Sequence, residues 1–165
     1  MLSRSIITSV VLTLLVVFSV SAEDGSYENR QIDQRSYHLG GVATFAEMVH
    51  VGVKKLALSA AVSPEEMDAM EDDMRRIAKK ENVLVYREPD LIVTDLFPKD
   101  VALGKDVMMI YRGSTLDEYL ALKQEKARLV KAGNYRGEAR KNIARKFGKL
   151  LSYPDTIIEE MIKQH

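Results

Sequence analysis

The sequence predicts an α/β protein with a small mixed sheet of about four strands, flanking helices and a helical C-terminal third. Three observations predict this class. In the middle of the chain, short apolar runs bounded by turn residues alternate with helical periodicity. Two of these runs enclose one helix, which is the order of a β-α-β unit. After residue 115, apolar residues recur only at helical spacing.

The N-terminal residues 1–22 have the pattern of a secretory signal peptide. Arg4 precedes a long uncharged apolar run, which ends in the small-residue cleavage pattern Val20-Ser21-Ala22. The apolar stretch is shorter than the roughly 20 residues that span a bilayer. We therefore expect a secreted or periplasmic product with no membrane span after cleavage. An uncleaved N-terminal anchor is the alternative.

The rest of the chain predicts one domain of ordinary composition. Residues 23–36 are polar and hold too little apolar surface to order themselves, so we expect a flexible lead before a single α/β domain at 37–165. The chain has no cysteine, which excludes disulfides and thiolate metal sites. Its 24 basic residues match its 24 acidic ones, so net charge does not direct it to nucleic acid.

The first half of the domain predicts a helix followed by a β-α-β unit. Apolar residues at helical spacing predict a helix over 39–51, and an apolar run predicts a strand at 55–59. Residues 63–66, Ser-Pro-Glu-Glu, place favourable N-cap, N1 and N3 residues at the start of the next helix. A strand at 83–87 completes the unit, for which we expect a right-handed parallel crossover.

Two further strands are predicted before the helical third. Residues 88–90, Glu-Pro-Asp, are a turn signal, and the apolar run at 91–97 predicts a strand that forms a hairpin with 83–87. A loop follows to residue 105. The run at 107–111 is apolar throughout and predicts another strand, whose hydrophobicity is compatible with an internal position.

Three helices are predicted after the last strand. Thr115 and Glu118 have the spacing of a capping box, so we expect a helix over 116–132 that ends at a glycine. A second helix is expected over 138–151. A third is expected to follow Pro154.

A Tyr-Arg pair at two predicted strand ends is the most suggestive functional feature. Ligands in open α/β sheets gather outside the carboxyl ends of parallel strands, and arginine forks suit carboxylate or phosphate. If the two strands are parallel neighbours, both pairs converge with a helix N-terminus. The candidate ligand-binding residues for a small anion are Tyr86, Arg87, Tyr111, Arg112, Ser114 and Thr115. The alternative is that these residues form ordinary surface ion pairs.

Catalytic and metal-binding candidates are few. His50 and Asp95 are the candidate acid–base residues, and an enzyme would need one of them beside an arginine clamp. Glu47 and His50 share a helix flank at i, i+3 and are the candidate metal ligands. The alternative is a solvated helix flank. The sequence predicts no cofactor.

The predicted C-terminal helices carry a basic segment. Residues 123–149 hold ten basic and two acidic side chains, and Lys141, Arg145 and Lys149 form one stripe at i, i+4, i+8. This stripe is a candidate surface for an acidic protein partner, for anionic lipid or for another polyanion. Nucleic acid is not expected, since aromatic stacking residues are missing. The alternative is a solvated helix face balanced by the acidic second helix.

Three classes of function follow from these observations. The first is an exported binding or accessory protein for a small anionic ligand. The second is a small periplasmic enzyme, a hydrolase, lyase or isomerase, that uses a histidine or aspartate with an arginine clamp. The third is a protein-interaction module that docks through its basic C-terminal helices and presents an exposed apolar patch.

Overall fold

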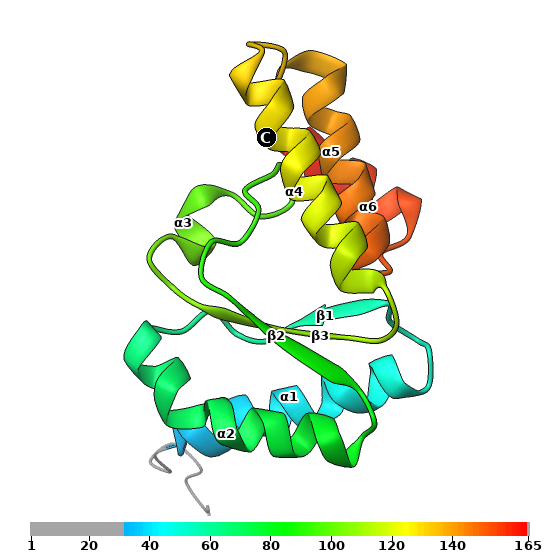
Figure 1. The fold of residues 1–165 in the computed structure, drawn as a ribbon. Helices are drawn as coiled ribbons and strands as arrows, with labels where there is room; N and C mark the ends of the chain where they lie inside the picture. The colour runs from blue at the N-terminus through cyan, green and yellow to red at the C-terminus, as the bar shows by residue number, and fades with distance from the viewer. Residues whose placement is uncertain (1–31, 165) are drawn as a thin grey trace, which may run out of the picture. The chain divides into compact units, whose positions relative to one another are not determined.

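The computed structural model describes residues 32–164, in which six helices surround a three-stranded sheet (Figure 1). The predicted signal peptide and the predicted lead up to residue 31 lie outside the described residues. The elements in chain order are α1 (Gln34–His50), β1 (Leu56–Leu58), α2 (Pro64–Lys80), β2 (Leu84–Glu88), α3 (Lys99–Ala102), β3 (Val107–Tyr111), α4 (Thr115–Lys131), α5 (Gly137–Leu150) and α6 (Asp155–Lys163). The α/β class is confirmed, but within these residues the sheet has three strands and not about four, and it is antiparallel and not mixed.

The last strand in the sequence is the central strand of the sheet, whose order is β1-β3-β2. Both outer strands pair antiparallel with β3, so that Ala57 lies opposite Ile110 and Arg87 lies opposite Met108. β1 and β2 are therefore parallel to each other, but β3 separates them. β3 has the longest buried run of the three strands, from Val107 to Ile110, which suits the position with two neighbours.

Residues 91–97 form an irregular loop, so the predicted hairpin strand is wrong. Ile92 and Leu96 in this loop are nonetheless buried. The Tyr119 hydroxyl accepts the backbone N–H of Ile92 at 3.2 Å, and the Thr94 hydroxyl accepts that of Leu96 at 3.2 Å. These side chains replace a strand ladder as partners of the backbone. The apolar run therefore indicated burial and not strand structure.

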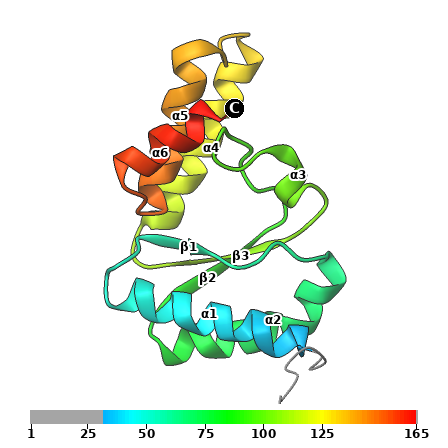
Figure 2. The ribbon, with the colours of Figure 1, turned by 180° about the vertical axis from the view of Figure 1, so that it is seen from behind.

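Helices cover both faces of the sheet, with α1 and α2 on one side and α4 to α6 on the other (Figures 1 and 2). Met74 of α2 and Met108 of β3 belong to one buried cluster, whereas Met109 of β3 and Phe147 of α5 belong to the second. This division follows from the alternation of side chains along a strand. Residues adjacent in β3 therefore join two separate cores.

The start of α2 confirms the expected capping, whereas the start of α4 does not. The Ser63 hydroxyl accepts the Glu66 N–H at 3.2 Å, and the Glu66 carboxylate accepts the Ser63 N–H at 2.9 Å. α4 begins at Thr115 itself, and the Thr115 hydroxyl donates to the carbonyl oxygen of Arg112 at 2.9 Å. Gly113, with φ of 56°, turns the chain two residues before Thr115, so that the helix begins at Thr115.

The first helix begins earlier than residue 39, inside the predicted lead. Arg35 in its first turn forms an ion pair with Asp73 of α2, and Ser36 hydrogen-bonds the carboxylate of Asp33. These contacts tie the polar first turn of α1 to the chain around it. The folded part therefore begins inside the polar segment 23–36, and not after it.

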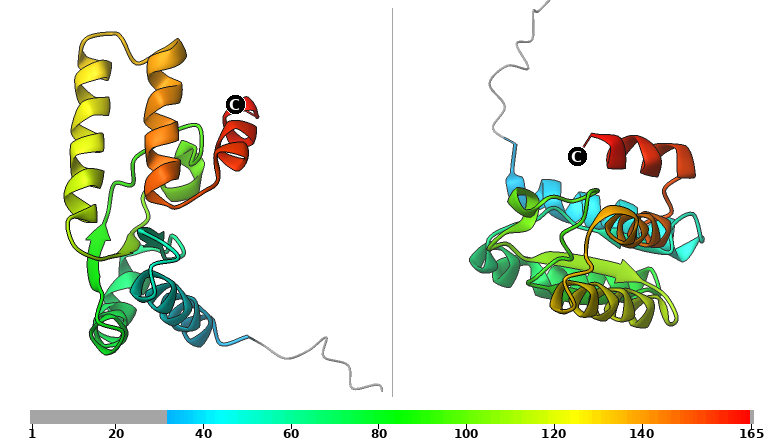
Figure 3. Two further views of the ribbon diagram at one scale, coloured as in Figure 1. Left: turned by 90° about the vertical axis from the view of Figure 1, so that its right-hand side faces the viewer. Right: turned by 90° about the horizontal axis from the view of Figure 1, so that it is seen from above.

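The helical C-terminal third is confirmed (Figure 3). α4 and α5 each begin and end one residue before their predicted bounds, and α6 starts directly after Pro154. α5 packs on α4 and on α6. In the stretch from residue 32 to 164, no helix combines the length and the hydropathy that a bilayer span requires.

Candidate functional site

The two Tyr-Arg pairs do not converge. β2 and β3 are antiparallel, and in their register Tyr111 lies opposite Leu84, at the far end of β2 from Arg87. Tyr86 and Arg87 are therefore at one end of the sheet, and Tyr111 and Arg112 are at the other. The expectation of parallel neighbours is wrong because the chain enters β3 from the side on which β2 ends.

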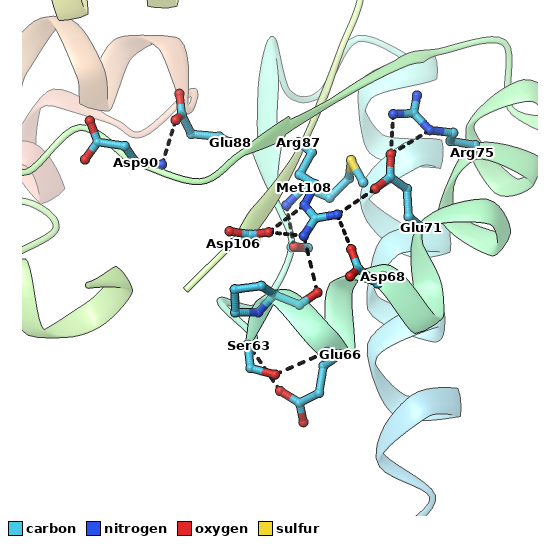
Figure 4. A network of polar contacts seen from close by, with 12 residues as sticks. Ser63, Glu66, Asp68, Glu71, Arg75, Arg87, Glu88, Asp90, Asp106 and Met108 are labelled. Atoms are coloured by element: carbon cyan, nitrogen blue, oxygen red, sulfur yellow. Dashed lines mark hydrogen bonds and ion pairs between the residues drawn. The ribbon is translucent and has the colours of Figure 1, made fainter. Parts of the chain in front are cut away.

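Arg87 is engaged by carboxylates of its own chain (Figure 4). Its guanidinium donates to Asp106 at 2.5 Å, to Asp68 at 2.5 Å and to Glu71 at 3.0 Å, and it also donates to the carbonyl oxygen of Pro64 at 3.2 Å. Asp106 is 4% exposed. Three acids around one guanidinium fasten α2 to the sheet, and they oppose an external anion at this position.

The carboxylates of this network predict that the free energy of unfolding depends on pH. Hydrogen bonds from Arg75 and Arg87 lower the pKa of Glu71 below its ordinary 4.5. Stability from this carboxylate is therefore present above pH 4.5 and is lost as pH falls through the lowered pKa. We expect Glu71→Gln to be less stable than the wild type at neutral pH, with a smaller loss of unfolding free energy between about pH 5 and pH 3.

Urea titrations at several pH values measure this effect. Glu65→Gln is the matched control, since Glu65 is exposed on the same helix and has no ion pair within residues 32–164. Its pH profile should follow that of the wild type. An unchanged profile for Glu71→Gln would contradict the role of the network in acid stability.

Arg112 of the second Tyr-Arg pair binds the C-terminal end of α1. Nη1 of Arg112 donates to the carbonyl oxygen of His50 at 2.8 Å, at the last residue of α1. A cation on a C-terminal carbonyl stabilises a helix end. Burial, with Asp117 nearby, raises the pKa of the Tyr111 hydroxyl. Ser114 is exposed as the N-cap of α4, where its side chain makes no capping hydrogen bond.

The candidate catalytic and metal-binding residues are not assembled into a site. Glu47 and His50 are both exposed on α1, and no group of three His, Asp or Glu residues that could hold a metal ion occurs within 32–164. Asp95 is buried on the opposite side of the sheet and forms an ion pair with Arg140 at 2.7 Å. His50 meets Arg112 only through its backbone carbonyl.

The basic stripe is largely neutralised by its neighbours. Nε of Arg145 lies 2.5 Å from the Glu159 carboxylate of α6, and Lys149 forms an ion pair with Asp155 of α6. Lys141 has no ion pair in the described part of the chain. Acids of α6, together with Glu138 of α5, therefore balance this face, and those of the acidic second helix do not.

The structure contains a small cavity beside the edge strand β1. No pattern in the sequence predicted it. It has a volume of about 180 Å³ and lies where β1, the 91–97 loop, Phe45 of α1 and the α5–α6 turn meet. Most of its lining is apolar. The apolar residues of the lining include Phe45, Ala57, Leu58, Leu91, Phe97 and Leu151.

Lys54 brings one positive charge to this cavity. Its ammonium donates to the carbonyl oxygen of Leu151 at 3.0 Å and lies 5.2 Å from the centre of the Tyr153 ring. The adjacent backbone N–H of Lys55 donates to the Ser152 hydroxyl oxygen at 2.9 Å, which holds this stretch against the α5–α6 turn. The ammonium is thus fixed in place and keeps two further N–H donors.

No acid among residues 32–164 neutralises this lysine. Lys54 is half-buried and takes part in none of the ion pairs of residues 32–164. Burial lowers the pKa of its ammonium. The pKa shift has the sign of a charge that lacks a compensating partner. The sequence offers one signal for this site, a lysine between Gly52 and an apolar run, and that signal is too common to single out.

The Ser59 hydroxyl in the lining of the cavity is already hydrogen-bonded. The Ser59 hydroxyl donates to the carbonyl oxygen of Ala60 at 2.8 Å and accepts the Met108 N–H at 2.9 Å. Ser59 has no histidine or carboxylate partner among its described hydrogen bonds. Among the described residues, Ser59 thus lacks the base that would activate it as a nucleophile, and the cavity combines apolar walls with the Lys54 ammonium.

No protein-family model, curated protein or solved structure matches this chain.

Proposed function

We propose that this protein binds a small carboxylate with an apolar body in the cavity beside β1, with Lys54 as the residue that recognises the charge. The observation that carries the proposal is a half-buried ammonium, without an acidic partner among the described residues, in the lining of an apolar cavity. A bound carboxylate would compensate the desolvated charge, and the cavity would remove the apolar body from water.

The size of the cavity supports a ligand of one ring or a short acyl chain. An apolar cavity of about 150 Å³ accommodates benzene, and the present one, at about 180 Å³, is slightly larger. Ligand sites are commonly apolar with a few fixed polar groups, and the Lys54 ammonium is held by Leu151 and Tyr153. With the predicted signal peptide, this favours an exported binding or accessory protein.

Thermal unfolding with benzoate and hexanoate tests the proposal. Both carboxylates should raise the melting temperature, since a ligand at a hundredfold excess over Kd stabilises the folded state by about 2.7 kcal/mol. Benzyl alcohol and hexanol, which lack the charge, should give little or no shift. Lys54→Met should abolish the carboxylate shift, because the apolar body alone leaves the carboxylate without its partner.

Lys55→Met is the matched control. Lys55 is the next residue, its side chain is exposed, and the same charge is removed. This variant should keep the full shift with both carboxylates. Equal shifts with the alcohols, or a full shift in Lys54→Met, would refute recognition of the charge by Lys54.

A further inference from the structure

A second hollow surface lies on the opposite side of the 91–97 loop, along α4. Two adjoining depressions of about 370 and 260 Å³ share Val93 and Lys126. We call them together the α4 groove. One wall is formed by residues 90–99, and the other is formed by α4 with the start of α5. The apolar and basic side chains exposed in this groove include Val93, Lys99, Lys126, Ala127, Val130 and Lys131.

Apolar side chains are exposed on both walls of the α4 groove. Val93 is 36% exposed and Val130 is 55% exposed. Ala127 lies one helical turn before Lys131 and is also exposed. Leu91 and Ile92 form a buried floor beneath them. The α4 groove thus offers an apolar strip to a narrow chain segment.

Positive charge is in excess along this strip. Five basic and two acidic side chains line the α4 groove. Lys123 and Arg140 are paired with the buried acids Glu88 and Asp95. Lys99, Lys126 and Lys131 have no ion pair within the described residues.

Lys126 is the best placed of the three unpaired lysines. Its ammonium lies 5.3 Å from the centre of the Tyr135 ring. Of these three lysines, Lys126 is the one that lines both depressions. Desolvation by burial lowers the pKa of its ammonium, against the opposing effect of Asp90. An incoming carboxylate would offset this desolvation.

We propose that the α4 groove binds an extended segment of a partner protein in which acidic side chains flank an apolar one. The excess of lysines selects the acidic side chains, and Val93 and Val130 contact the apolar residue between them. The apolar strip is recessed between two walls, which suits a single peptide chain better than the flat surface of a bilayer. This inference is independent of the Lys54 cavity.

Fluorescence anisotropy with a labelled peptide composed of Glu and Leu tests this proposal on the full chain. The peptide should bind, and the corresponding Lys–Leu peptide should not. Lys126→Glu should weaken binding at least about tenfold, because it removes an attractive charge and adds a repulsive one. Lys141→Glu makes the same charge change at an exposed position on α5 outside the α4 groove, and it should alter binding by less than about twofold.

The apolar contact has its own matched pair. Val130→Ser should weaken binding of the Glu–Leu peptide, whereas Val53→Ser, at a residue 63% exposed elsewhere, should not. Both valines are exposed, so neither variant threatens folding, and circular dichroism melts verify this for every variant. Equal losses in Lys126→Glu and Lys141→Glu would overturn the proposal. So would binding to phosphatidylglycerol vesicles without binding to the peptide.

Discussion

Replacing Lys123 by methionine is expected to lower the unfolding free energy by about 3 kcal/mol, since removing one partner of a buried ion pair leaves the other charge uncompensated. Lys123 lies 3.1 Å from the carboxylate of Glu88, which is only 2% exposed. The same ammonium donates to the carbonyl oxygen of Asp90 at 2.5 Å. This contact fastens α4 to the end of β2, where the irregular loop begins.

The double variant Lys123→Met/Glu88→Gln separates the buried charge from the packing. It should recover most of the lost stability, because a neutral amide can still accept the Asp90 N–H that Glu88 accepts at 2.8 Å. Lys131→Met is the control, since Lys131 is exposed on the same helix. Urea denaturation measures all of these variants. A loss in Lys123→Met no larger than that in Lys131→Met would argue against a structural role for the pair.

The second large effect is expected at Gly148 on α5. A Cβ atom there would lie 2.6 Å from Cγ1 of Ile158 and 2.9 Å from Cδ2 of Leu96, in a buried contact between α5, α6 and the irregular loop. Gly148→Ala should therefore cost about 2 kcal/mol through overpacking. Alanine is favoured over glycine within a helix by roughly 1 kcal/mol, so Gly148→Ala is destabilised because the steric cost is larger than this gain.

Gly40→Ala isolates the helix propensity. Gly40 is exposed within α1, and an added Cβ there meets no atom within 4 Å. This variant should gain up to about 1 kcal/mol. The two alanine variants thus shift the denaturation midpoint in opposite directions. A stabilised Gly148→Ala would show that α6 can move away from α5 at little cost.

The elements that local chemistry specifies could be predicted from the sequence. Ser63 and Glu66 meet as a capping box, and the apolar run at 107–111 is a strand in the centre of the sheet. Helical spacing was enough to predict α5, whereas α4 was predicted from a capping-box spacing and a terminal glycine, although the capping box itself does not form. Each of these signals involves residues within a few positions of one another, so no knowledge of distant contacts is needed.

Strand direction and side-chain partners depend on distant contacts and could not be predicted. Two Tyr-Arg dipeptides contain no information on whether β2 and β3 are parallel. Asp68 and Asp106 each lie 19 positions from Arg87 in the sequence, yet both reach its guanidinium. The Lys54 cavity is space left between segments from α1, β1, the 91–97 loop and the α5–α6 turn. Such a space has no pattern within any one of them.

The most direct test of carboxylate binding by Lys54 is a nuclear magnetic resonance titration with hexanoate, which reports the position of the ligand as well as its affinity. We expect chemical-shift changes centred on Lys54, Leu58 and Tyr153, with the Lys54 side-chain signals among the most affected. Saturable shifts at these residues would establish the cavity beside β1 as the binding site. Shifts that are absent, or that centre on Lys126 in the α4 groove, would contradict it.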